Sequence, residues 1–199
     1  MHGLVLRTLQ VFLRDTYGTE CWADVAARAC LDPSEFEAML RYDPALLDQI
    51  LAAAEAVLGK PREALIEDVG IYLVSHPNCD PLRRLLRYGG RDFIDFLYSL
   101  EDLPDRTRLA VPDLDIPDLS LVDKDGECFT LMVKGDVPGF GHVLVGMLRA
   151  MADDYGALAV LEYTGTHPGG ESVSITVVRT DYAKGKGFAL AAGPGAARA

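Results

Sequence analysis

Apolar residues recur every three or four positions through the first half of the chain, and this spacing predicts a series of amphipathic helices. A first helix is expected from Leu4 to a stop at Gly18. Asp32-Pro33 and Asp43-Pro44 each place a capping residue before a proline, so both pairs predict helix starts. Further helices are expected over 22–29, 33–40, 45–58, 61–76 and 81–90.

The period changes in the second half. LSLV (119–122) and CFTLMV (128–133) are rich in strand formers and are joined by a turn sequence, which predicts a β-hairpin. A second hairpin is expected from 157–164 and 172–179, and the apolar helix 142–156 lies between the two hairpins. The pattern predicts an α+β fold: a helical N-terminal half, then an antiparallel sheet packed with one long helix. We expect one domain over 1–180, followed by a flexible Gly/Ala-rich tail over 181–199.

The segment YSLEDLPDRTRLAVP (98–112) raises a separate question. Phe93, Phe96, Leu97 and Leu100 have helical spacing, and then Pro104 and a polar run follow. Proline has no N–H and biases the preceding residue away from helical backbone angles. The sequence alone therefore predicts that this helix ends at Pro104.

Charge and cysteine content narrow the class of protein. The 199 residues are 49% hydrophobic with a net charge of −11, which argues against a nucleic-acid surface or an anionic membrane surface. No apolar run approaches the roughly 20 residues that a membrane span requires. The four cysteines are scattered without a CxxC pair, which is typical of reduced thiols. We expect a cytoplasmic globular protein.

The candidate catalytic and metal-binding residues do not form a recognised set. His76 and Cys79 have a spacing that metals use but lack a second ligand pair, and His142 has no accompanying nucleophile. The acids over 101–118 have no fixed helical register and match a calcium loop poorly. GDVPGFG (135–141) precedes a helix, so its N–H groups are candidates for binding an anion, although it lacks a phosphate-loop ending. We therefore expect a binding protein without catalytic residues and without a metal site.

Several segments, taken in order, resemble the H-NOX, or haem nitric oxide/oxygen-binding, family. They are MHGLVLRTLQ, YGTECWADVAARACL, AVLGKPREALIEDVGIYLV, GGRDFIDFLYSLEDLPDRTRLAVPDLDIPDL and the helix VLVGMLRAM. The resemblance covers roughly residues 1–180. It implies an α+β gas-sensor domain that holds a b-type haem and regulates kinases or cyclases.

The resemblance fails at the residues that would hold haem. Pro104 stands where the family has its axial histidine, and a proline ring has no lone pair for iron. Val133, Gly135 and Val137 stand at the Y-x-S-x-R positions that hold the haem propionates in the family. By residue chemistry no cofactor is expected, although haem is what the family would imply.

The positions that line the family's haem cavity remain apolar. They are Val5, Leu73, Pro117, Val143 and Met147. Three hypotheses follow: a haem-based NO/O2 sensor with a substitute axial ligand, a haem-free regulatory domain, or a sensor of an apolar small molecule with the 135–141 amides at its acidic end. Because no kinase or cyclase fits in the chain, we expect a standalone domain of bacterial type that acts on a separate histidine kinase or cyclase-type partner.

Overall fold

The computed structural model describes residues 1–32, 34–135 and 137–187. Four helices open the chain: α1 (Gly3–Tyr17), α2 (Thr19–Arg28), α3 (Ala45–Leu58) and α4 (Arg62–Ser75). After the 3₁₀ turn η1 (Pro77–Cys79) come α5 (Asp80–Arg87), α6 (Phe93–Tyr98), the 3₁₀ turn η2 (Ser99–Asp102) and α7 (Leu103–Ala110). The last elements are β1 (Asp118–Asp123), β2 (Cys128–Lys134), α8 (Phe140–Tyr155), β3 (Leu158–His167) and β4 (Gly170–Arg179). Both predicted hairpins and the α+β order are confirmed.

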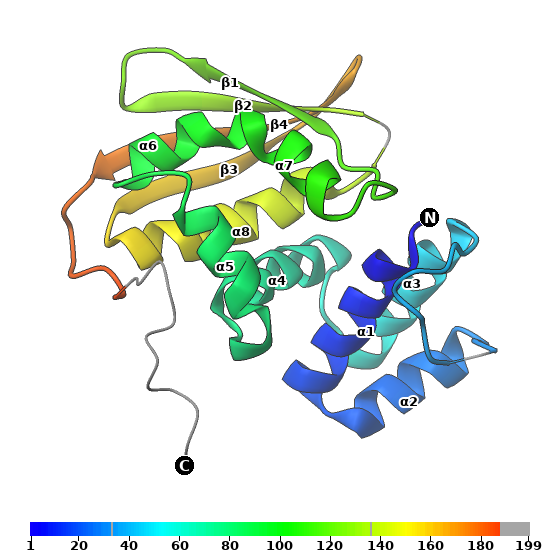
Figure 1. Ribbon diagram of the computed structural model, residues 1–199. Helices are drawn as coiled ribbons and strands as arrows, with labels where there is room; N and C mark the ends of the chain where they lie inside the picture. Colours follow the sequence, from blue (N-terminus) through cyan, green and yellow to red (C-terminus); the bar gives the residue numbers. More distant parts are fainter. Residues whose placement is uncertain (33, 136, 188–199) are drawn as a thin grey trace.

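The four strands form one antiparallel sheet in the order β1-β2-β4-β3. Helix α8 packs against the sheet, α4 packs against α8, and α1–α3 gather on the other side of α4 (Figure 1). Within the described residues, no helix is both long enough and apolar enough to cross a bilayer.

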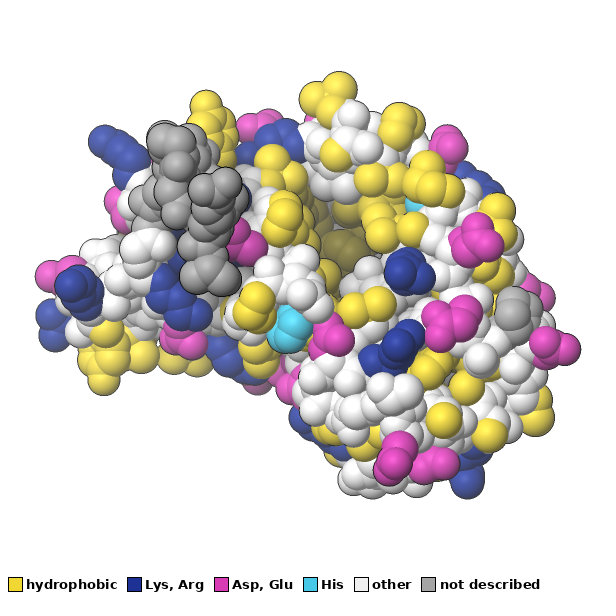
Figure 2. Space-filling model, turned by 60° about the horizontal axis from the view of Figure 1, so that its bottom comes forward, with side chains coloured by type: hydrophobic (Ala, Val, Ile, Leu, Met, Phe, Trp, Pro, Cys, Tyr) yellow, Lys and Arg dark blue, Asp and Glu magenta, His cyan; other side chains and the backbone are white. Residues whose placement is uncertain are grey.

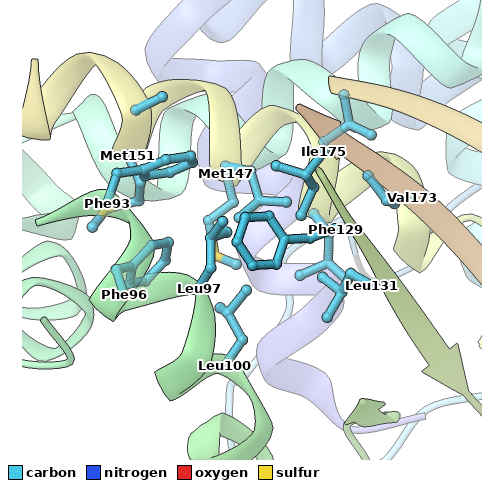
Figure 3. Packing of buried hydrophobic residues seen from close by; sticks show 14 of the residues in the cluster. Phe93, Phe96, Leu97, Leu100, Phe129, Leu131, Met147, Met151, Val173 and Ile175 are labelled. Carbon is cyan, nitrogen blue, oxygen red and sulfur yellow. The ribbon is translucent and has the colours of Figure 1, made fainter. Parts of the chain in front are cut away.

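The described residues form two hydrophobic cores. The larger core joins the sheet to α8 and to the aromatic face of α6, including Phe93, Phe96 and Phe129 (Figure 3). The smaller core joins α1, α2 and α3 through residues such as Phe12 and Trp22. Helix α4 contributes Leu65 and Tyr72 to the smaller core and Val74 to the larger one.

Glycines allow α4 and α8 to approach unusually closely. A Cβ added at Gly146 would lie 1.9 Å from the carbonyl oxygen of Glu67, and one added at Gly70 would lie 2.1 Å from that of Val143. Only glycine leaves room for backbone contact at both points. The two cores are therefore held by a crossing that tolerates no side chain at its centre.

The helix predicted over 33–40 is wrong for the described residues 34–40, which form bends and turns. Phe36 is buried between the rings of Trp22 and Tyr42, and its backbone N–H donates to Gln10 Oε1 at 3.1 Å. Gln10 also donates to the Glu35 carboxylate at 2.7 Å. Burying this one aromatic ring with its N–H satisfied fixes the segment as a loop against α1, whatever its capping residues favour.

The predicted tail begins at residue 181. Ala183 N–H donates to the Gly156 carbonyl at 2.9 Å, and Lys186 N–H donates to the Asp154 carbonyl at 2.9 Å. Residues 181–187 thus lie against the C-terminal end of α8, and residues 188–199 lie outside the described part of the chain.

Candidate functional site: an apolar interlobe cleft

The segment around Pro104 does not end in the way the sequence predicts. Asp92 caps α6 by accepting from Asp95 N–H at 2.9 Å, and the chain then tightens into η2 before α7 begins at Leu103. Leu103 N–H donates to the Leu100 carbonyl in this 3₁₀ turn. In a continuous α-helix the Leu100 carbonyl would accept from the N–H of residue 104, which a proline lacks. Because Leu103 N–H already donates to this carbonyl, Pro104 leaves no acceptor unsatisfied.

Pro104 therefore starts a helix, and the prediction of a helix end at this residue is wrong. It lies in the first turn of α7, a position where a proline needs no donor. Its ring is buried beside Leu103, a member of the larger core. The segment stays helical through Ala110, so residue 104 is presented from a firmly packed element.

The five predicted cavity residues divide into two groups. Met147 and Pro117 are buried, and Met147 belongs to the larger core. Val5, Leu73 and Val143 are half-buried and belong to neither hydrophobic core of the described residues. They come from α1, α4 and α8, and α4 contacts both of the other helices.

Figure 2 shows a hollow on this side of the molecule, with hydrophobic side chains on its floor and along its rim. We call the hollow between α1–α3 and the sheet-bearing part the interlobe cleft. Half-buried apolar side chains outside both cores are the expected lining of such a cleft.

The segment from β2 to α8 carries the positions where the resemblance expects polar side chains. Val133 is 2% exposed, packs within the larger core and pairs with Leu119 and Glu171 across the sheet. Gly135 has φ +147°, and a Cβ there would lie 3.5 Å from Pro117. Val137 is half-buried. These three residues supply no side-chain donor.

The backbone N–H groups at the start of α8 already hold an anion. Gly139 N–H donates to Glu171 Oε1 at 2.7 Å, and Gly141 N–H donates to Glu171 Oε2 at 2.6 Å. The expectation that these amides meet the acidic end of a ligand is therefore wrong for both glycines. Sequence reasoning missed Glu171, because only the strand register brings it to this helix end.

Each described histidine has another role. His2 caps α1 by accepting from Leu4 N–H at 3.2 Å, and His76 accepts from Asn78 N–H at 3.3 Å. His142 stacks on Tyr163 with ring centroids 4.1 Å apart and lies 3.4 Å from the Glu67 carboxylate. His167 contacts Ser172 Oγ. Across 1–32, 34–135 and 137–187, no three His, Cys, Asp or Glu side chains cluster in a way that suits a metal ion.

The pattern of the haem-NO-binding (HNOB) family matches residues 2–162. The chain belongs to this family. The family's domain is a sensor and not a catalytic unit, as the lack of a catalytic set predicted.

Curated relatives are cyclases much longer than this chain. Soluble guanylate cyclase gcy-31 of Caenorhabditis elegans is 23% identical over 154 residues, which is 77% of this chain and 22% of the relative. Soluble guanylate cyclase 89Db of Drosophila melanogaster is 22% identical over 163 residues, 82% of this chain and 24% of the relative. The chain thus spans about a quarter of the length of the relatives it matches.

Solved structures confirm the H-NOX fold. The Fe(II) unliganded H-NOX protein from K. algicida superposes with a TM-score of 0.78 at 17% identity, covering 92% of this chain and all of that one. A mutant of the T. tengcongensis H-NOX protein gives a TM-score of 0.74 at 14% identity, covering 90% of this chain and 99% of that one. At these identities the likeness concerns the fold.

Proposed function

We propose that this chain is a haem-free regulatory domain of the haem-NO-binding family, with the interlobe cleft as a binding site for an apolar small molecule. The observation that carries the proposal is Pro104. It stands where the resemblance puts the axial histidine, and its ring is buried in the first turn of α7. A proline ring nitrogen is an amide with no lone pair for iron.

The residues at the propionate positions support the same conclusion. Val133 is a core residue, Gly135 packs on Pro117, and Val137 is aliphatic. Haem carboxylates in a protein need cations or donors, and buried charge-assisted hydrogen bonds are among the strongest polar contacts. The side chains present therefore do not fit an ordinary haem at either its iron or its carboxylates.

The second candidate function is a haem-based NO/O2 sensor with a substitute axial ligand. It needs a free imidazole or thiolate facing the cleft. The four described histidines have the capping, stacking and hydrogen-bonding roles given above. Burial raises the pKa of the Cys21 and Cys79 thiols, which disfavours their thiolate forms, so the haem-free function is the better supported of the two.

For output, we propose that the domain acts on a separate signalling protein, of the histidine kinase or cyclase type that the family implies. In the two cyclase relatives the matching segment makes up only 22% and 24% of the whole chain. We place the protein in the cytoplasm, because its four cysteines are all free thiols, as expected in a reducing compartment. Residues 1–180 are the proposed functional unit.

A visible spectrum tests the cofactor proposal. Protein expressed with added haem should lack a stoichiometric Soret band that shifts with nitric oxide; such a band would overturn the proposal in favour of the substitute-ligand sensor. The fourfold variant Pro104→His, Val133→Tyr, Gly135→Ser and Val137→Arg should gain haem absorbance. Pro112→His, which puts the same imidazole at an exposed proline of the same segment, should gain none.

Native mass spectrometry tests the ligand. A retained apolar molecule should appear as added mass in gently purified protein. Val143→Trp, which enlarges one of the half-buried apolar residues outside both cores, should remove that mass while the protein stays folded. Bare protein together with a Val143→Trp variant of unchanged stability would leave only the partner-binding reading of the haem-free domain.

A further inference from the structure

One arginine joins the two parts of the molecule that the interlobe cleft separates. Arg41 lies in the loop between α2 and α3, and its Nη2 donates to the Asp113 carbonyl at 3.1 Å. Its Nη1 lies 3.7 Å from Asp115 Oδ2. Asp113 and Asp115 belong to the connection from α7 to β1, which lies close to the N-terminus in Figure 1. We call these two contacts the Arg41 bridge.

The Arg41 bridge has no polar counterpart elsewhere between the two parts. Over 1–32, 34–135 and 137–187, the hydrogen bonds and ion pairs between residues 1–58, the small lobe, and residues 80–187 are confined to it. The other polar contacts that the small lobe makes outside itself are with residues 59–79, such as the hydrogen bond from Tyr72 to Asp15 at 2.6 Å. A single side chain therefore makes the direct polar link from the small lobe to the sheet-bearing part.

Both ends of the bridge are close in sequence to predicted cavity residues. Arg41 forms an isolated antiparallel bridge with His2, which caps α1 three residues before Val5. On the other side, Asp115 lies two residues before the buried Pro117. The Arg41 bridge thus ties the start of α1 to the segment that enters β1.

The exposure of the bridge suits a contact that opens and closes. The Arg41 side chain is 56% exposed and that of Asp115 is 86% exposed. Exposed ion pairs contribute little to stability and are screened by salt. The bridge can therefore break while both hydrophobic cores stay folded.

We propose that the Arg41 bridge is a salt-sensitive gate of the interlobe cleft, which holds the small lobe to the α7–β1 connection and slows the entry and exit of the ligand. The inference rests on the proposed function, because it assigns a regulation to the ligand site of that cleft. A closed gate hinders passage in both directions, so it should change the association and dissociation rates together and leave the affinity nearly unchanged.

Stopped-flow fluorescence with the neutral apolar dye N-phenyl-1-naphthylamine tests the gate on the full chain. Arg41→Gln should raise both rates by about threefold or more and change the dissociation constant by less than about twofold. Added salt, from about 0.05 M to about 0.5 M NaCl, should speed exchange in the native protein and not in Arg41→Gln. Arg14→Gln, which breaks an exposed ion pair with Glu35 inside the small lobe, should change neither rate.

A charge swap separates the gate from a purely structural role of Arg41. Arg41→Glu places a carboxylate opposite Asp115, and this repulsion should give the fastest dye exchange of the single variants. Adding Asp115→Lys restores opposite charges and should return both rates to within about twofold of the native values. If residue 41 mattered only for the folding of its own loop, a change at residue 115 would not rescue it.

Hydrogen exchange followed by mass spectrometry measures the gate without a ligand. Leu114 N–H donates to the Val111 carbonyl at 3.1 Å within the α7–β1 connection. The peptide 111–117 should exchange about threefold faster in Arg41→Glu than in the native protein, and the charge swap should reverse the change.

The outcomes distinguish the gate from the function on which it rests. Unchanged dye rates in the Arg41 variants, or unchanged exchange over 111–117, would overturn the gate while the cleft still binds its ligand. If the dye does not bind, or if Val143→Trp leaves its binding unchanged, the cleft fails as the ligand site and the gate fails with it.

Discussion

The two ends of α8 each meet a buried carboxylate, and different chemistry balances the charge of each. At the C-terminal end, the Asp154 side chain is 1% exposed and pairs with Arg83 at 2.7 Å and Arg87 at 3.3 Å. At the N-terminal end, Glu171 accepts two backbone N–H groups. A helix is positive at its start and negative at its finish, so the acid at the finish needs cations and the acid at the start does not.

The two acids also differ in the number of segments that they join. Asp154 joins three segments, since Arg83 and Arg87 come from α5 and the Asp154 carbonyl accepts from Lys186 of the C-terminal segment at 2.9 Å. Arg83 also donates to the Gly187 carbonyl at 3.3 Å. Glu171 joins only β4 to the start of α8, through Gly139 and Gly141. Asp154 therefore holds more of the fold together than Glu171 does.

The largest effect should come from Asp154→Asn. Removing this charge leaves two largely buried guanidinium groups without their shared carboxylate, and breaking a buried pair in this way typically costs about 3–5 kcal/mol. Urea unfolding at pH 7 measures the loss. Asp153→Asn makes the same change on the exposed neighbouring residue and should stay within about 0.5 kcal/mol of the native protein. Equal effects at 153 and 154 would contradict the framework role.

Glu171→Gln should cost less, about 1–2 kcal/mol, in the same unfolding assay. The glutamine oxygen still accepts one N–H, and no buried cation is left behind, so the loss is that of a charge-assisted hydrogen bond at a helix end. Glu162→Gln is the matched control, as an exposed acid of the same sheet. If Glu171→Gln proves as costly as Asp154→Asn, the two ends of α8 are equally structural and the comparison fails.

Sequence patterns were sufficient where one segment determines its own structure. The period of α4 and the strand-turn-strand signals of both hairpins are local, and these elements formed as predicted. The 33–40 helix failed because the burial of Phe36 depends on Gln10 and Trp22, more than ten residues away. Tertiary burial outweighed a local capping signal there.

The candidate site shows the same limit. The loss of a metal ligand at Pro104 could be inferred from the sequence, since that conclusion needs only residue chemistry and the family resemblance. The position of Pro104 at a helix start could not be inferred from the sequence, because it depends on the hydrogen bond from Leu103 N–H to the Leu100 carbonyl in η2. Glu171 could not be found from sequence, because its partners Gly139 and Gly141 lie 32 and 30 residues away.

The smallest effect concerns a third carboxylate, Asp15, which is more exposed than the other two and joins α1 to α4. The Tyr72 hydroxyl donates to it at 2.6 Å and the Asn78 amide at 2.9 Å, and these hydrogen bonds, the first above all, lower the pKa of Asp15. A carboxyl whose folded pKa is lowered stabilises the fold above its ordinary pKa near 3.8. That stabilisation is lost as the pH falls through the lowered folded value.

Tyr72→Phe should therefore destabilise the protein at pH 7 by under about 1 kcal/mol from this contact, since a single hydrogen bond to a partly exposed acid contributes little. The native-to-variant difference in unfolding free energy should begin to shrink as the pH falls below 3.8, and it should disappear once the pH has fallen through the lowered folded pKa of Asp15. Asp15→Asn should show the same loss, and the double variant should add little to either. A difference that is constant from pH 7 to pH 2 would mean that Tyr72 acts only through the packing of its ring in the smaller core.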